Sequence, residues 1–310
     1  MALSKIQTSE MLDTPNLGRR NLVINGAMSI NQRAATSGIT SGYFVDRFQL
    51  SGVSASAVIT SSTPTEFPTA ITVSATSGNP IILQKIESKM VQHLSGKVVT
   101  VSFYAKNISN ATTLYTSLQY AGSADNFGST TTISEQNLGN LTTDWVKYTA
   151  SWTVPAGGLN GLSLNILCAG SSTFTMGVTG VQLEVGDIAT DFEHRSFGEE
   201  LSACQRYYQT FENNQLQGSR NSGTRLRIGA STRVDMRTNP AISRPTGTTV
   251  IFQIDAASIS STSTTAAQGT TSSPRMIAFD LGGFTGAVDR AYTGAASYVG
   301  TAVFVADAEL

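Results

Sequence analysis

Between residues 98 and 185, short segments of alternating apolar and polar residues follow one another, separated by turn-forming clusters. The clearest are at 98–105, 114–120 and 162–168. Alternation gives a strand one face for a core and one for solvent or a ligand. A helical period is absent between these segments, so they predict a β-sandwich built from short, closely spaced strands.

Composition agrees with an all-β chain. Ser, Thr, Gly and Ala are overused, whereas Lys and Glu, which normally cover helices, are scarce. The 310 residues are enough for two domains. With 13% charged residues and a net charge of −1, the chain is neither disordered nor a basic nucleic-acid binder.

The two cysteines, Cys168 and Cys204, are far apart and form no CxxC motif. We expect two buried thiols rather than a disulfide, a zinc site or a redox pair. The first 15 residues contain no apolar core of a signal peptide, and no segment is apolar enough to span a membrane. Synthesis in a cytoplasm, without membrane insertion, is therefore expected.

A helix is predicted after the β-sandwich, followed by a second β region. Leu201, Cys204, Tyr208 and Phe211 share one helical face, and Ser196 with Glu199 forms a capping-box pattern. Strands are then expected at 225–230, 234–236, 248–254, 275–281 and 298–305, and an exposed loop at 258–273. The predicted fold class is all-β: a jelly-roll β-sandwich, a short helix and a second small β-domain.

Several ordered motifs resemble those of phage tail fibre and virion appendage proteins that contain a jelly roll similar to carbohydrate-binding modules. The quoted segments are RRNLVINGAMSINQR at 19–33, YFVDRF at 43–48, VTVSFYAKN at 99–107, LTTDWVKYTASWTVPAG at 141–157, GVQLEVG at 180–186, TDFEHRS at 190–196, EELSACQRYY at 199–208, VDMRTNPAIS at 234–243 and VFVADAEL at 303–310. The resemblance divides the chain into a virion-attachment arm at 1–19, the jelly roll at 20–196, a linking helix at 197–212 and a C-terminal β tip domain at 213–310.

The resemblance implies a homotrimer located in the virion, which contacts other virion proteins through the arm. Its tip would bind a host surface receptor, a glycan or a protein, without enzymatic activity. Two alternatives stay open. One is a head fibre, decoration or nozzle-associated structural protein, and the other is a glycan-cleaving tailspike.

Two groups of residues are candidates for receptor binding. The first lies among glycines in the tip, where loops commonly carry recognition: Phe284, Asp289, Arg290, Tyr292 and Tyr298. The second is Trp145 and Trp152, either of which could stack on a sugar ring. Their odd spacing places them on opposite faces of a regular strand, so at most one of them faces the core. Core or subunit contacts are the alternative role for both.

Catalytic and metal-binding patterns are weak. His194 lies at the junction between the β regions, where a structural contact is expected, and no hydrolase or phosphate-loop motif occurs. A glycan-cleaving enzyme would need a carboxylate pair, and nothing distinguishes Asp46, Asp125, Asp144, Asp187 and Asp191 from turn residues. Asp46, Glu184 and Asp187 could hold calcium, but no ordered calcium loop exists. We therefore predict no catalytic residue, no metal and no cofactor.

Overall fold

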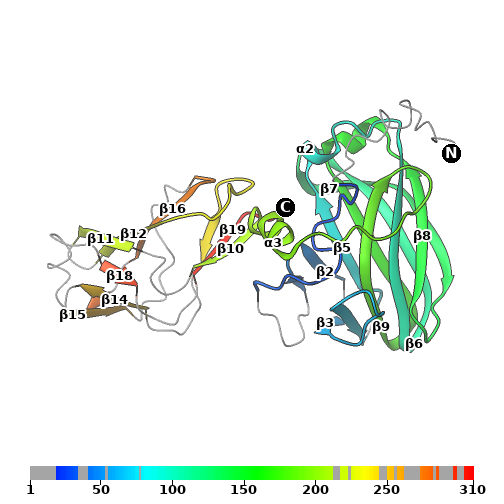
Figure 1. Cartoon of the computed structure of the whole chain (residues 1–310), viewed down its shortest axis with the longest axis horizontal. Coiled ribbons are helices and arrows are strands. Elements are labelled where there is room, and N and C mark those ends of the chain that lie inside the picture. The colour runs from blue at the N-terminus through cyan, green and yellow to red at the C-terminus, as the bar shows by residue number, and fades with distance from the viewer. Residues whose placement is uncertain are drawn as a thin grey trace, which may run out of the picture. The chain divides into compact units, whose positions relative to one another are not determined.

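The computed structural model describes residues 19–33, 41–52, 55–76, 78–211, 217–222, 225–243, 250–254, 257–261, 273–281, 284–285, 296–298 and 304–310. It divides into two compact units. Unit 1 comprises residues 1–200 together with Leu310, and unit 2 comprises residues 201–309. The two are coloured from blue to green and from green to red in Figure 1.

Unit 1 is built almost entirely from strands. They are β1 (Gly42–Val45), β2 (Phe48–Ser51), β3 (Ala55–Thr60), β4 (Ala70–Ala75), β5 (Ile81–Ile86), β6 (Val98–Ser123), β7 (Asn126–Asn140), β8 (Val146–Thr153) and β9 (Leu162–Val185). A short helix, α2 (Ser88–Val91), and a 3-10 helix at Ala156–Asn160 connect some of them. The alternating segments expected at 98–105, 114–120 and 162–168 are confirmed as parts of the long strands β6 and β9.

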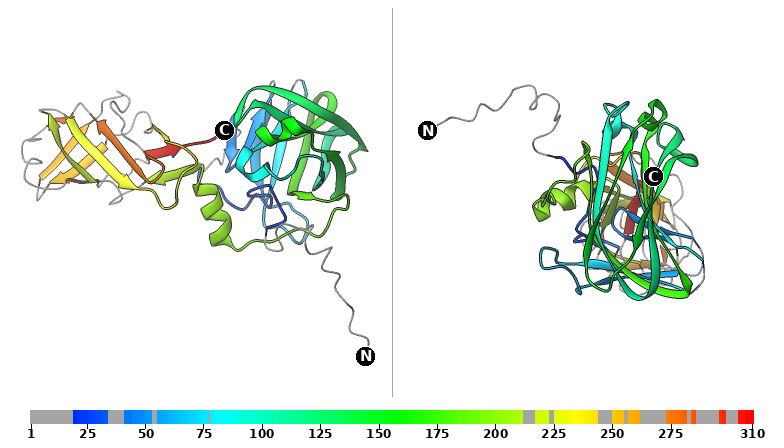
Figure 2. Two further views of the ribbon diagram at one scale, coloured as in Figure 1. Left: turned by 90° about the horizontal axis from the view of Figure 1, so that it is seen from above. Right: turned by 90° about the vertical axis from the view of Figure 1, so that its right-hand side faces the viewer.

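Two long strands pass from one layer of unit 1 to the other. The first half of β9 pairs with β5 and with the second half of β6, whereas its second half pairs with β4 and with the first half of β6. Layer A is therefore β1-β2-β5-β9-β6-β7, and layer B is β3-β4-β9-β6-β8. Figure 1 shows β6, β8 and β9 running side by side, and Figure 2 shows the strands from two further directions.

The core of unit 1 lies between the layers and is filled by alternate residues of their strands. Layer A contributes Leu114, Leu118, Leu164 and Ile166, and layer B contributes residues such as Val99, Val101, Phe103, Val178 and Leu183. These side chains are at most 1% exposed. Burial of this apolar surface is the main favourable term for the unit, at roughly 25 cal/mol per Å² removed from water.

Side chains also join the layers at one side of the core, where β7 lies near β8. The indole nitrogen of Trp152 donates to the carbonyl oxygen of Ser134 at 3.1 Å, and Gln136 Nε2 donates to that of Ser151 at 2.6 Å. These bonds occupy backbone acceptors on two strands that each pair only with β6 in the described part of the chain. They therefore cover edges that would otherwise be open to pairing with another chain.

Unit 2 contains two sheets. The helix α3 (Phe197–Gln205) leads into it, and the first sheet has the order β10-β19-β13. The second has the order β16-β12-β11-β18-β14-β15-β17. The bounds are β10 (Tyr208–Phe211), β11 (Gln217–Ser222), β12 (Arg225–Ser231), β13 (Ala241–Ser243), β14 (Val250–Ile254), β15 (Ala257–Ser261), β16 (Met276–Leu281), β17 (Phe284–Thr285), β18 (Ala296–Tyr298) and β19 (Phe304–Asp307). The predicted fold class, all-β with a short helix and a second small β-domain, is confirmed.

The helix α3 is shorter than the linking helix predicted at 197–212. It ends at Gln205 rather than near residue 212, because Tyr208–Phe211 pairs antiparallel with Phe304–Asp307 as β10 and β19. Aromatic residues and Thr favour strands, and pairing with a distant strand outweighs the helical spacing. Its predicted start is confirmed, because the hydroxyl of Ser196 accepts from the amide of Glu199 and donates to the carboxylate of Glu199 at 2.8 Å.

Two further expectations in unit 2 are wrong. Residues 234–236 form no strand, since the amide of Met236 bonds the carbonyl of Pro274 outside any ladder. Residues 258–261 belong to β15, which pairs with β14, whereas the expected loop began at 258. Ser and Thr occur in strands as well as in loops, so the composition of this segment does not distinguish a strand from a loop.

The two cysteines are buried and are not joined by a disulfide, as expected. Burial raises the pKa of the Cys168 thiol to about 11, although a hydrogen bond with the backbone of Thr112 opposes it. The thiol is therefore protonated at neutral pH and unreactive. Over the described residues, no helix is both long and apolar enough to cross a membrane.

Candidate functional site

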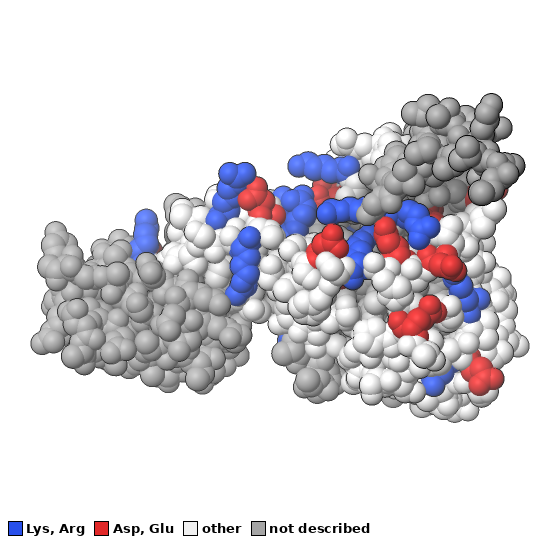
Figure 3. Space-filling view, in the orientation of Figure 1, with Lys and Arg blue, Asp and Glu red and all other residues white. Residues whose placement is uncertain are grey.

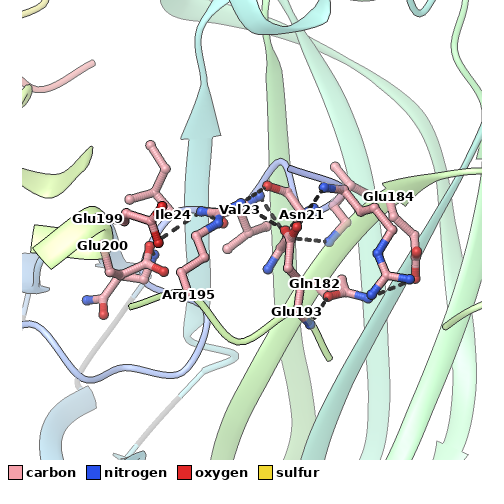
Figure 4. A network of polar contacts seen from close by, with 12 residues as sticks. Asn21, Val23, Ile24, Gln182, Glu184, Glu193, Arg195, Glu199 and Glu200 are labelled. Atoms are coloured by element: carbon pink, nitrogen blue, oxygen red, sulfur yellow. Dashed lines mark hydrogen bonds and ion pairs between the residues drawn. The ribbon is translucent and has the colours of Figure 1, made fainter. Parts of the chain in front are cut away.

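The motifs that start and end the jelly roll meet in one polar network, shown in Figure 4. Asn21 is its centre. Its Nδ2 donates to the carbonyl of Val181 at 3.1 Å, and its Oδ1 accepts from the amides of Val23 at 2.9 Å and Leu183 at 3.0 Å. One amide side chain therefore fixes irregular backbone near residue 22 to the end of β9.

Two charged residues extend this network. The carboxylate of Glu193 accepts from the backbone amides of Arg20 and Asn21 at 3.0 and 2.8 Å. The guanidinium of Arg195 donates to the carbonyls of Asn21 and Val23 and pairs with Glu193 and Glu200, at 3.3 and 3.5 Å. Burial alone raises the pKa of Glu193, but the two amides and the Arg195 charge outweigh it and lower that pKa.

The last strand carries the rest of the network. Gln182 Oε1 accepts from the amide of Glu193 at 2.8 Å, and its Nε2 donates to Glu184 at 2.9 Å. Glu184 also accepts from the amide and hydroxyl of Thr190 at 2.8 and 2.7 Å. We call Asn21, Gln182, Glu184, Glu193, Arg195 and Glu200 the signature network, because they lie in the motifs quoted above.

Gly26, in the first motif, also joins the start of the jelly roll to the end of β9. A Cβ on Gly26 would lie 2.0 Å from the carbonyl oxygen of Val181, and the carbonyl of Gly26 itself accepts from the amide of Val181 at 2.9 Å. Two backbone segments that are distant in sequence therefore touch without room for a side chain.

Unit 2 contains a second network of the same kind. Arg237, from the motif at 234–243, donates to the carbonyls of Ala308 and Glu309 at 2.7 and 2.9 Å. Gln209 accepts from the amide of Arg233 and donates to the carbonyl of Gln205. The motifs that carry the resemblance are thus engaged in bonds within their own unit, and a ligand site has to be sought elsewhere.

His194 has the structural contact expected of it. Its ring lies 4.9 Å from that of Phe192 and 5.8 Å from that of Phe67, centroid to centroid. Phe67 in turn lies 5.5 Å from Tyr104 and covers Gly180. These rings cover part of the outer face of layer B, the face turned away from the core.

The outer face of layer A, by contrast, carries rows of polar and aliphatic side chains, with Tyr115 among them, that the strand register aligns. One row is Gln49, Leu83, Asn165, Ser117 and Glu135. The rows on either side are Ser51, Ile81, Leu167, Tyr115 and Asn137, and Lys85, Ser163, Gln119 and Thr132. Their strand neighbours point into the core, so these side chains point outward.

The centre of this face is a chain of hydrogen bonds. Asn165 Nδ2 donates to the hydroxyl of Ser117 at 3.2 Å, and Asn165 Oδ1 accepts from the hydroxyl of Ser163 at 3.0 Å. Further along, Gln119 bonds the hydroxyls of Thr130 and Thr132. These bonds hold planar amide groups in fixed orientations. Asn165, Ser117 and Ser163 are 3–4% exposed, so of the two amides only that of Gln119 is partly exposed to a ligand.

The border of the outer face of layer A combines aromatic rings with a lysine. Tyr43, opposite Gln49 in the β1–β2 register, lies under the guanidinium of Arg33 at 4.8 Å. Lys85 Nζ lies 5.4 Å from the ring centroid of Phe127 and donates to the carbonyl of Leu310 at 2.7 Å. Burial, together with the charge of Arg47, lowers the pKa of Lys85.

The two predicted tryptophans have different environments. Trp152 points into the core from β8 and is 4% exposed, so its ring offers no stacking face. Trp145 lies just before β8 and is partly exposed, resting on Gly177 of layer B. The expectation that at most one faces the core agrees with this placement.

The predicted tip site falls largely outside the described residues. Asp289, Arg290 and Tyr292 are not described, and Phe284 and Tyr298 are described only as positions in β17 and β18. These two strands belong to one sheet, with β14 and β15 between them. The site stays a prediction.

Two of the candidate carboxylates, Asp46 and Asp125, accept hydrogen bonds from other groups of the described part of the chain. There, no three or more His, Cys, Asp or Glu side chains gather as metal ligands would. Asp46 accepts from Gln32, and Asp125 accepts from the amide of Ser88. On the face that it shows, Figure 3 has the positive and negative residues of unit 1 interspersed rather than separated.

Sequence reasoning did not assemble the outer face of layer A, although Tyr115 has the residue type of a sugar-stacking side chain. Asn165, Ser117 and Gln49 come from three strands, and only the register aligns them. The signal for this face was the polar residues of each alternating segment. Alternation places these residues on the face away from the core, but it does not tell whether that face meets solvent or a ligand.

No protein family and no curated protein sequence matches the chain. Among solved structures, the chain is similar to the enzymatically active domain of bacteriophage CBA120 tailspike protein 4. Identity there is 16% and the TM-score 0.39, over 54% of this chain and 21% of that one.

Two carbohydrate-binding modules are similar at the same level. One is TmCBM61 in complex with β-1,4-galactotriose, with 12% identity, a TM-score of 0.36 and coverage of 54% of this chain and 100% of that one. The other is the C-terminal family 22 module of Clostridium thermocellum Xyn10B. There the identity is 15% and the TM-score 0.37, and the match covers 53% of this chain and 100% of that one. At these scores, the architecture of unit 1 rests on its own strand pairing.

Proposed function

We propose that this protein is a phage virion structural protein, a tail fibre that recognises a host surface glycan without cleaving it. The observation that carries glycan recognition is the outer face of layer A. Its partly exposed side chains include Tyr115, Gln49 and Gln119, and Asn165 and Ser117, which are aligned with them, are 4% and 3% exposed. Aromatic faces stack on sugar rings, and amides and hydroxyls bond their hydroxyl groups.

The non-enzymatic part of the proposal is supported by the chemistry of the same face. In the three rows of residues named above for the outer face of layer A, Glu135 is the only carboxylate. Glycoside hydrolysis by the usual route requires two carboxyl groups on either side of the bond that breaks. A binding role needs no such pair.

The test is a glycan array probed with the full-length protein, with release of reducing ends assayed on every hit. We expect binding without release. Tyr115→Ala should weaken binding to the best hit about tenfold, because the stacking surface is lost. Thr149→Ala is the matched control, since Thr149 is exposed on β8 at the outer face of layer B.

Two results would overturn the proposal. Release of reducing ends would make the protein a glycan-cleaving tailspike, the alternative from a different functional class. Equal losses for Tyr115→Ala and Thr149→Ala would remove the outer face of layer A as the site. The tip residues would then be tested next, beginning with Arg290→Ala and Tyr292→Ala.

The remaining parts of the proposal concern assembly. We propose a homotrimer that joins other virion proteins through residues 1–19 and is located in the virion. Analytical ultracentrifugation should give three times the mass of one chain, and a monomer mass would contradict it. A protein lacking residues 1–19 should fail to enter particles in a complementation assay. If it enters normally, a head fibre or decoration role with another attachment point becomes the better hypothesis.

A further inference from the structure

A second exposed aromatic surface lies on the outer face of layer B, away from the rows described above. Trp145 rests on Gly177, where a Cβ would lie 2.8 Å from Cη2 of the indole. Gly177 is flanked in the sheet by Lys106 of β6 and Thr72 of β4. The absence of a side chain at Gly177 therefore lets the indole lie directly on the sheet.

Lys106 is held beside this indole. Its Nζ lies 5.2 Å from the centroid of the Trp145 ring and 3.4 Å from the hydroxyl of Ser62. Within the described part of the chain it forms no ion pair, and the neighbouring Asp144 does not pair with it. A lysine held over an indole is attracted by the ring but keeps its charge available to a ligand.

Two other lysines of unit 1 are engaged differently. Lys147 Nζ donates to the carbonyl of Thr190 at 2.7 Å, and Lys85 Nζ donates to that of Leu310. Each of these ammonium groups bonds a backbone acceptor. Lys106 differs from these two lysines, because its ammonium group contacts the face of an aromatic ring and makes one long hydrogen bond to a hydroxyl.

The apolar surface beside Lys106 is the partly exposed indole of Trp145 itself. In the proposed ligand, C–H groups would contact this indole, while an anionic group would meet Lys106. A pyranose that carries a carboxylate has both features.

We propose that Trp145 and Lys106 form a second binding site of this protein, which takes an acidic sugar residue such as a uronate. The indole contacts the apolar face of the ring, and the ammonium group of Lys106 pairs with the carboxylate. Hydroxyls of Ser62 and Thr72 lie beside these two residues in contact or in register. The site is independent of the outer face of layer A.

The test titrates the full-length protein with a galacturonate tetramer and, separately, with its methyl ester, while tryptophan fluorescence is recorded. The two probes share the same sugar chain, and esterification replaces each carboxylate by an uncharged methyl ester. We expect the acid to bind about tenfold more tightly than the ester, as a charge-assisted contact would give. The change in fluorescence should vanish in Trp145→Phe, which retains the buried Trp152.

Three variants assign the preference to a residue. Lys106→Met should abolish the difference between acid and ester, and Lys106→Arg should restore most of it. Lys89→Met, at an exposed lysine of α2, is the matched control and should bind like the parent. A Lys89→Met variant that loses the preference as well would overturn the assignment, because general surface charge would then explain it.

The outcome is separable from that of the proposed function. Tyr115→Ala should leave the fluorescence response of Trp145 to the acid unchanged, even when it weakens the best array hit. If the acid and the ester bind the parent protein equally, or if neither changes the fluorescence, the inference is wrong whatever the array shows.

Discussion

The signature network and the outer face of layer A use similar polar residues for opposite purposes. In the network, the side-chain oxygen and nitrogen of Asn21 both bond backbone groups, and so does the carboxylate of Glu193. On the outer face of layer A, Asn165 bonds only neighbouring hydroxyls, and Gln49 and Tyr115 are partly exposed. Recognisable motifs therefore mark how this chain holds itself together, while the recognition surface that we propose lies in less conspicuous residues.

The largest expected effect in this comparison is that of Asn21→Ala on the stability of the protein. Three buried backbone groups, at Val23, Val181 and Leu183, would lose their partner. At roughly 1 kcal/mol or more for each, we expect a loss of about 3 kcal/mol in the free energy of unfolding. Urea denaturation of the full-length protein measures it, and a loss below about 1 kcal/mol would mean that water replaces the side chain.

A second test uses pH. The folded protein lowers the pKa of Glu193 from 4.5, so the ionised form stabilises the fold. This contribution is present above the unfolded value of 4.5 and is lost as the pH falls through the lower folded value. Thermal unfolding from neutral pH to about pH 3 should show the parent losing its advantage over Glu193→Gln on acidification. A constant difference across this range would contradict the assignment.

A smaller effect is expected at the start of α3. Ser196→Ala removes the hydroxyl that accepts from the amide of Glu199. Loss of such a cap costs about 1 kcal/mol. Urea denaturation would measure it against Ser196→Thr, which keeps the hydroxyl and should remain within a few tenths of the parent.

The smallest effect on stability should come from the recognition side of the comparison. Glu135→Ala removes an exposed side chain from a row of the outer face of layer A. Surface substitutions of this kind change the free energy of unfolding by no more than about 0.5 kcal/mol. If Glu135→Ala destabilises the protein as much as Asn21→Ala does, the two regions do not differ in the way proposed.

The sequence predicted much of unit 1 because its signals are local. Alternation identified β6, β8 and β9, and the pattern at Ser196 and Glu199 located the start of α3. The end of that helix was mispredicted because Tyr208–Phe211 pairs with a strand about a hundred residues further along the chain. Helical spacing within a short window contains no information about such a partner.

The candidate sites were less predictable for the same reason. Trp145 was identified by its residue type, but its support depends on Gly177, and its cation comes from Lys106 of another strand. Alignment of Gln49, Asn165 and Ser117 follows from three registers that no local pattern specifies. The signature network, finally, joins residues 160 and 162 positions apart.

The sharing of β6 and β9 between both layers has a mechanical consequence. Each of these strands is hydrogen-bonded to the other on both sides of the bend, from Val99 opposite Val185 to Tyr120 opposite Leu162. One layer cannot slide or peel away from the other without shearing this paired ribbon, because the same two strands belong to both. A pull between β6 and β9 along their length would load many parallel bonds together, so unit 1 should transmit tension as a stiff body rather than unravel strand by strand.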